Sequence, residues 1–302
     1  MSINWMDLVA SFAGGLFGAA LGALPAFIFT GVAVLVGAAA GLGGSSFDFL
    51  GNIAFGPIFG PHIAFAGGVA AAAFAARKDK LSSGKDLSSA LAGLGDPAVL
   101  LVGGGFGIVG YLVQKVLGLY FTGYTDTVGL TVILSAVAAR LLFGKSGLFG
   151  KLSPEAARRG RFAPGGDEVW APWQQEWVQV LTLGLGAGLM SAWIALKVAE
   201  VNPQLAGLGG VIGFGISATS LLFLQFGVKV PVTHHITLVA ALAAATSGNL
   251  LVGGLFGMLT AVVGECASRL MLIHGDTHID PPANAIWSMS LVVLVLAKLH
   301  IM

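Results

Sequence analysis

The sequence predicts an all-α polytopic membrane protein of about ten transmembrane helices, arranged as two inverted five-helix repeats. Three observations lead to this prediction: the hydropathy of the chain, an internal duplication, and the positions of its basic loops. Hydrophobic residues make up 56% of the 302 positions and charged residues only 10%, whereas soluble domains carry about 25% charged residues. So few charges cannot cover a water-facing surface, and we therefore expect the lipid bilayer to be the main partner.

The duplication is clearest where LLVGGGFG at 100–107 recurs as LLVGGLFG at 250–257, with seven of eight positions identical. In the same register, Asp126-Thr127 falls on Asp276-Thr277. A second correspondence has the order Phe-Gly, proline, His-Ile, and joins the segment before His62 to the segment before His235. We therefore divide the chain into a first repeat at 1–150 with a cytoplasmic loop at 78–97, a basic cytoplasmic linker at 151–176, and a second repeat at 177–302.

A spanning helix needs about 20 apolar residues, and the apolar runs place five spans in each repeat. Between the first two runs, Ala23-Leu-Pro25 is either a turn or a kink. Segments 45–62 and 228–236 are either loops or re-entrant helices. The expected spans lie near 6–24, 26–50, 57–77, 98–121 and 127–144, and then near 177–199, 203–227, 229–248, 250–272 and 281–299.

An odd number of spans per repeat requires the two copies to enter the membrane in opposite directions. Basic residues follow the third and the fifth expected spans, so that both basic loops fall on one face, which the positive-inside rule makes cytoplasmic. Both termini are then outside, in a membrane of the bacterial inner (cytoplasmic) type. The residues that carry this argument are Arg77, Lys78, Lys80 and Lys85, then Lys145, Lys151, Arg158, Arg159 and Arg161, with Trp170, Trp173 and Trp177 as an interfacial belt.

Composition also narrows the class of partner. The net charge of +1 gives no electrostatic basis for binding nucleic acid, and the single cysteine, Cys266, excludes a disulfide framework. The 46 glycines fit close helix packing in lipid. We expect no cofactor beyond a coupling proton or metal cation, and a homo-oligomer is compatible with the sequence.

Ionisable residues inside apolar spans are costly and are therefore candidates for function. Glu265 is the deepest of them, and its counterpart in the first repeat is Lys115. Two roles fit Glu265: coupling of a proton or cation, or a structural ion pair with Lys115 or with Arg269, which lies one helical turn further on.

Histidine follows proline near the start of a span in both repeats, as His62 and as the pair His234-His235. A proline at such a place interrupts the helix, and histidine can donate, accept or titrate near neutral pH. These histidines are interpreted either as a shared pathway or as caps of their own turns. Three hydroxyl residues complete the expected pathway: Ser46, Ser217 and Thr233. The alternative for the two serines is structural, because serine in a helix often bonds the carbonyl of its own turn.

The segment before the last expected span carries His274, Asp276, His278 and Asp280 at alternate positions. In an extended strand these four side chains would share one face and could bind zinc or manganese. The other readings are a polar turn and an entrance that attracts cations. Asp280 before Pro281 predicts a helix N-cap with proline in the first turn, and Asp126 would be its analogue before the fifth span.

Together these features favour a secondary transporter, coupled to a proton or an ion, that binds a small polar solute or ion between the two repeats. A passive channel for small solutes or ions is the alternative. A membrane-embedded enzyme is disfavoured, because no nucleophile and base stand out as a pair. The sequence contains no Walker motif, no Asn-Pro-Ala pair and no zinc-protease helix.

Overall fold

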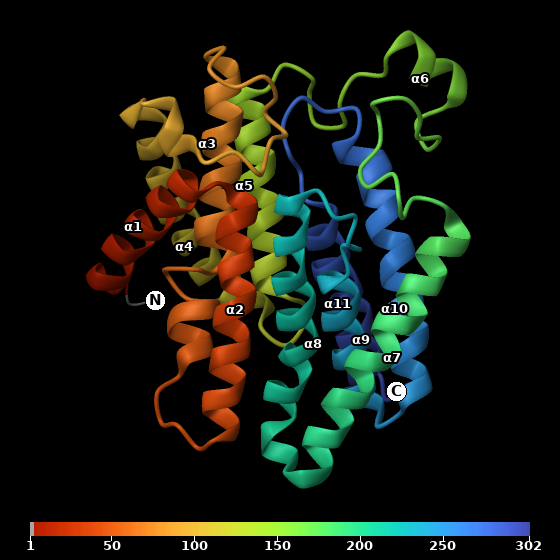
Figure 1. Ribbon diagram of the computed structural model, residues 1–302. Coiled ribbons are helices and arrows are strands. Elements are labelled where there is room, and N and C mark those ends of the chain that lie inside the picture. The colour runs from red at the N-terminus through yellow and green to blue at the C-terminus, as the bar shows by residue number, and fades with distance from the viewer. Residues whose placement is uncertain (1–2) are drawn as a thin grey trace.

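Helices account for 72% of the chain in the computed structural model, which describes residues 3–302 (Figure 1). This part of the chain contains no β-strand, only two isolated bridges. Within it, six helices are long and apolar enough to cross a membrane, and two further apolar helices, Trp5–Leu21 and Thr127–Phe143, are shorter. The all-helical class agrees with the prediction from the sequence, but the number of full-length spans is smaller than the expected ten.

The elements follow one another in a similar order in the two halves. The first half contains α1 (Trp5–Leu21), α2 (Ala23–Leu42), the π-helical turns η1 (Leu50–Ala54) and η2 (Pro61–Phe65), α3 (Ala66–Arg77), η3 (Leu91–Leu94), α4 (Pro97–Phe121) and α5 (Thr127–Phe143), and α6 (Pro154–Arg159) lies in the linker. The second half contains α7 (Trp177–Val201), η4 (Pro203–Leu205), α8 (Ala206–Ser220), η5 (Leu221–Phe226), α9 (His234–Ser247), α10 (Leu250–Ala267), η6 (Ser268–Leu272) and α11 (Pro281–Lys298).

Several expected spans are shorter in the structure, because glycine and proline interrupt them. The expected span 26–50 ends at Leu42, and the next one starts only at Pro61, after a stretch that contains glycine and proline. In the second half the expected span 229–248 starts at His234. The first break is a turn and not a kink, because Gly22, with a φ of 96°, separates α1 from α2.

Each half contains a group of three helices that pack on one another and two further helices that contact the other half. Helices α1, α3 and α4 pack on one another, and so do α7, α9 and α10. The remaining helices join the halves, since α2 packs on α8 and α5 packs on α11. Figure 1 shows α1 and α4 on the left and α7 and α10 on the right, with α8 and α11 between them.

Helices α2 and α8 run in opposite directions along their contact (Figure 1). Gly31 lies against Ala218 and Thr219 near the end of α8, whereas Gly41 lies against Leu208 near its start. The two helices are therefore an antiparallel pair at the junction of the halves.

The closest helix crossings in each half depend on glycine. Gly15 of α1 touches the backbone of Gly103 and Gly107 on α4, and Gly184 of α7 touches the backbone of Gly257 on α10. Helices in lipid associate through such contacts, which a side chain would prevent. The repeated glycine motif thus sits at the corresponding crossing of each half.

Both basic loops lie at one end of the molecule, the upper end in Figure 1. Gly84, in the loop after α3, forms a bridge with Thr277. In the linker after α5, the backbone N–H of Lys151 donates to the carbonyl of His274 at 2.9 Å. The loop before α11 therefore contacts both basic segments.

The glycine crossing gives a stability prediction. A methyl group at Gly107 would collide with the backbone carbonyl of Ser11, whereas one at Gly105 on the same helix would meet no atom within 4 Å. We expect Gly107→Ala to lower the free energy of unfolding by about 1–3 kcal/mol and Gly105→Ala to leave it unchanged or slightly raised. Thermal unfolding of the two variants in detergent measures this difference, and equal melting temperatures would contradict the role given to the crossing.

Candidate functional site

A cavity of 360 Å³ lies where the two halves meet, and the N-termini of four helices reach it. From the first half, Pro61 is the first residue of η2 and Asp126 is the N-cap of α5. From the second half, His234 is the first residue of α9 and Asp280 is the N-cap of α11. All four residues line the cavity, so each half contributes two helix starts to it.

Two of these helix starts are capped by carboxylates. Oδ1 of Asp126 accepts a hydrogen bond from the N–H of Gly129 at 2.6 Å, and Oδ2 of Asp280 accepts one from the N–H of Ala283 at 2.8 Å. The first N–H groups of a helix have no partner within it, and an unsatisfied polar group is costly in apolar surroundings. Both caps are the ones predicted from the sequence, including Pro281 in the first turn of α11.

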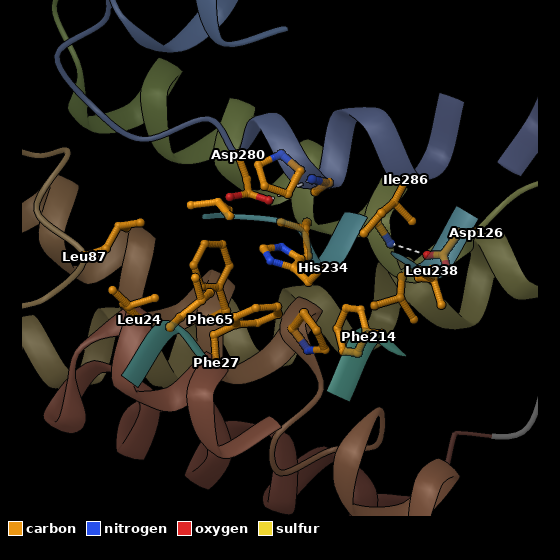
Figure 2. Close-up of a pocket in the computed structure, with 18 of the residues that line it drawn as sticks. Leu24, Phe27, Phe65, Leu87, Asp126, Phe214, His234, Leu238, Asp280 and Ile286 are labelled. Atoms are coloured by element: carbon orange, nitrogen blue, oxygen red, sulfur yellow. Dashed lines mark hydrogen bonds between the residues drawn. The ribbon is translucent and has the colours of Figure 1, made fainter. Parts of the chain in front are cut away.

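The wall of the cavity is mostly aromatic and aliphatic (Figure 2). The ring of Phe27 lies 4.6 Å from that of His234 and 5.7 Å from that of Phe65, and the ring of Phe214 lies 5.8 Å from that of His234. Neither lysine nor arginine is among the lining residues. Aliphatic side chains complete the wall, among them Leu24, Leu87, Leu238 and Ile286.

The structure separates the predicted histidines. His234 lines the cavity and is only 6% exposed, and its Nδ1 has no hydrogen-bond partner in the protein. His235 lines a smaller neighbouring cavity together with Glu265 and Trp170. His62 is equally buried but does not line the central cavity. One member of the histidine pair therefore faces the site.

The three predicted hydroxyl residues also differ in position. The hydroxyls of Ser217 and Thr233 are both buried and lie 3.0 Å apart, where they connect α8 to the start of α9. Ser46 is exposed in the turn that follows α2. The structure thus brings Ser217 and Thr233 together beside His234 and leaves Ser46 at the surface.

Glu265 forms a buried ion pair. Its Oε1 lies 2.8 Å from Nε of Arg269, one helical turn further on. The guanidinium also donates to the carbonyls of Phe162 and Gln175 in the linker, both at 2.9 Å, and covers the ring of Trp177 at 4.3 Å. Arg269 therefore attaches the linker to the end of α10 while it neutralises Glu265.

Lys115, the counterpart of Glu265 in the first repeat, does not take part in this pair. It is exposed on α4, with its Nζ 5.3 Å from the centre of the Tyr111 ring. Of the two partners that the sequence left open for Glu265, the structure supplies Arg269. Glu265 also lines the smaller cavity and not the central one.

The four residues considered as metal ligands do not converge on one point: His274 and Asp276 bond other segments, and His278 and Asp280 contact each other. Nε2 of His274 lies 2.9 Å from a carbonyl of the linker, and Asp276 accepts a hydrogen bond from Ser146 at 2.6 Å. His278 lies 3.1 Å from Oδ1 of Asp280, and both line the central cavity. Within residues 3–302 no three His, Cys, Asp or Glu side chains converge as metal ligands. The segment is folded as a polar turn and not as a strand with one shared face.

A buried arginine fastens this turn to α5. Arg140 donates from Nε to the hydroxyl of Thr277 and from a guanidinium nitrogen to the carbonyl of Leu148, both at 2.9 Å. Burial acts to raise the pKa of Asp276, but hydrogen bonds from Ser146 and from a backbone N–H, together with the charge of Arg140, place that pKa below its ordinary value. Asp276 is thus held as a carboxylate with a structural part in the turn.

The linker covers one side of the site. Nε1 of Trp173 donates to the carbonyl of Val230 at 3.0 Å, and Oε1 of Gln174 accepts from the N–H of Val232 at 2.8 Å. Trp170 and Val232 line both cavities and form the boundary between them. The tryptophans assigned to an interfacial belt therefore include one that lines the site.

No sequence pattern indicated the aromatic wall. Phe27, Phe65 and Phe214 lie in apolar spans. In such spans the hydropathy pattern does not show which apolar side chain faces a cavity and which faces lipid or another helix. Asp126, by contrast, could have been added to the site, because it lies in the repeated Asp-Thr pair and precedes a predicted helix.

Comparison with known protein families gives one match. A family model described as "Family of unknown function (DUF7973)" matches the chain twice, over residues 1–158 and again over residues 153–302. No curated protein and no solved structure matches. Since the two matches together cover the whole chain, the chain belongs to this family.

The ion pair of Glu265 is tested by changing each charge in turn. We expect Glu265→Met to destabilise the protein by about 3–5 kcal/mol, because it leaves the buried charge of Arg269 without its counterion. Adding Arg269→Met should restore part of this stability, whereas adding the matched change Lys115→Met should restore none. Melting temperatures of the single and double variants in detergent measure the coupling. Equal recovery with Lys115→Met would show that the assigned partner is wrong.

Proposed function

We propose that this member of the DUF7973 family is a secondary transporter that binds a small solute in the central cavity, between two inverted repeats. The observation that carries the proposal is the meeting of two helix starts from each half at one cavity. Transporters built from inverted repeats bind their substrates at the repeat interface, beside the ends of interrupted helices. The two matches of one family model and the opposite directions of α2 and α8 support two inverted copies.

The same cavity offers groups for coupling to a proton or cation. Asp126, Asp280 and His234 are ionisable, line the cavity and lie among apolar side chains. Ionisable groups in such surroundings at membrane depth are typical of ion and proton pathways. We assign coupling to these three residues and not to Glu265, whose carboxylate is already paired with Arg269.

Access to the cavity is controlled, in this proposal, by the linker. The hydrogen bonds of Trp173 and Gln174 hold the linker against the segment 230–232, and Trp170 closes the cavity on that side. By the positive-inside rule this side faces the cytoplasm. Release of these bonds would open the cavity to the cytoplasm, while rearrangement of α2 against α8 and of α5 against α11 would open it to the other side.

The orientation predicts which positions an impermeant thiol reagent reaches. In a Cys266→Ala background, a cysteine at Ser82, in the basic loop after α3, should be protected in intact cells. A cysteine at Gln204, between α7 and α8, should be labelled in the same cells. Both positions are exposed on the protein, so a difference in labelling reports the side of the membrane. Labelling of Ser82→Cys and protection of Gln204→Cys would reverse the orientation.

Alternating access predicts that a cysteine in the cavity can be reached from either side. In the same background, we expect Val211→Cys, on the cavity wall, to be labelled both in right-side-out and in inside-out vesicles. The matched control is Leu259→Cys, because Leu259 is exposed on the outer surface of α10, midway along the helix, and a lipid-facing thiol stays unreactive in both.

Planar-bilayer recordings of the purified protein complete this test. A transporter gives no unitary currents, whereas unitary current steps would make the protein a channel. Labelling of Val211→Cys from one side only, or from neither, would exclude alternating access.

A further inference from the structure

We propose that the central cavity binds a protonated organic amine, a monovalent cation with an apolar or aromatic body. This inference rests on the proposed function, since the cavity is the solute site named there, and it specifies the chemical class of the solute. Four features of the cavity carry it: the sign of its charged side chains, the balance at its helix ends, its aromatic wall, and one histidine nitrogen without a partner.

The charged side chains of the cavity wall are acidic. Asp126 and Asp280 line the cavity, and no lysine or arginine does. Each aspartate directs one oxygen to an N–H of its own helix, and the other oxygen of Asp280 lies 3.1 Å from Nε2 of His278. Carboxylates accept hydrogen bonds and do not donate them. A ligand group with several N–H donors and a positive charge therefore matches this wall better than an anion does.

The partial positive charge of the helix N-termini reduces the negative charge at the two aspartates but does not reverse it. A helix N-terminus carries about half a positive charge, spread over backbone groups and effective within the first turn. A capping carboxylate that is ionised carries a full negative charge on two oxygens, so the starts of α5 and α11 present net negative charge in that state. The starts of η2 and α9 have no side-chain cap and would attract an anion. The competing ligand is therefore a zwitterion, and the test below includes one.

The aromatic wall suits the body of such a cation. Rings of Phe27 and Phe214 lie within 5.8 Å of the His234 ring, and Phe65 lies 5.7 Å from Phe27. Aromatic faces attract cations held within about 6 Å, and they also bury apolar carbon. At 360 Å³ the cavity has a volume typical of small-molecule sites.

His234 provides the second polar contact. It is only 6% exposed, and its Nδ1 has no hydrogen-bond partner within the protein. Figure 2 shows its imidazole among the aromatic rings, with Asp280 above it and Asp126 at the far end, beyond Leu238 and Ile286. An ammonium group beside Asp280 could also donate to this imidazole. A bare metal ion is a poorer match, because within residues 3–302 no three ligating side chains converge.

The test compares four compounds that share a phenyl ring and a short chain and differ in charge. These are phenethylamine (cation), hydrocinnamate (anion), phenylalanine (zwitterion) and phenylpropanol (neutral). Binding to the purified full-length protein is measured by calorimetry. We expect phenethylamine to bind about tenfold or more tightly than each of the others, as a charge-assisted hydrogen bond provides.

Two variants connect the preference to the carboxylates. Asparagine is as good an N-cap as aspartate, so Asp126→Asn and Asp280→Asn retain the helix starts and remove the charges. We expect each to weaken phenethylamine binding about tenfold and to leave phenylpropanol binding unchanged, which shows that the cavity is intact. The matched control is Asp79→Asn, at an exposed position with positive φ that asparagine tolerates. It should bind phenethylamine as the natural chain does.

The other outcomes overturn the proposal. Tighter binding of phenylalanine would make the site zwitterionic, equal binding of phenylpropanol would make it an apolar cavity without charge preference, and binding of none of the four would exclude this class of solute. Retention of phenethylamine binding in both asparagine variants would also overturn it. None of these results affects the two-sided labelling of Val211→Cys, so the amine proposal and the transporter proposal can fail separately.

Discussion

The structure depends on how helices that begin inside the protein satisfy their first backbone N–H groups. Four helix starts meet at the central cavity, where apolar walls leave little competition from water. An unsatisfied N–H in such a place is costly, and carboxylates at Asp126 and Asp280 meet this need for α5 and α11. The same requirement therefore places ionisable groups at the junction of the two halves, because the side chains that cap these helices also line the cavity.

Close contact between helix backbones determines where the structure has room for a cavity. Glycines such as Gly15 and Gly184 allow α1 to lie against α4 and α7 against α10 without intervening side chains. Within each half these crossings leave little room. The contacts between halves, α2 with α8 and α5 with α11, also bring Phe27 and Phe214 to the wall of the cavity. The cavity accordingly lies between the halves and not within either of them.

The few charges buried in this apolar chain each have a partner that holds a segment in place. Glu265 neutralises Arg269, which in turn bonds two linker carbonyls. Arg140 bonds the turn before α11. Removing one member of such a set would strand a charge in a low-dielectric interior. These sets attach the linker and the turn to the helices, and through the linker they hold Trp170 at the cavity wall.

The sequence by itself determined the helical class, the membrane-compatible length of several helices, and the caps at Asp126 and Asp280. These properties are local, since they depend on hydropathy over one helix or on the chemistry of neighbouring residues. Only the tertiary structure decided that His234 and not His62 lines the cavity, that Glu265 pairs with Arg269 and not with Lys115, and that phenylalanines of distant helices form one wall. Those outcomes depend on which segments pack together. Contacts between residues that are distant in the sequence cannot be inferred from the residue type at any single position.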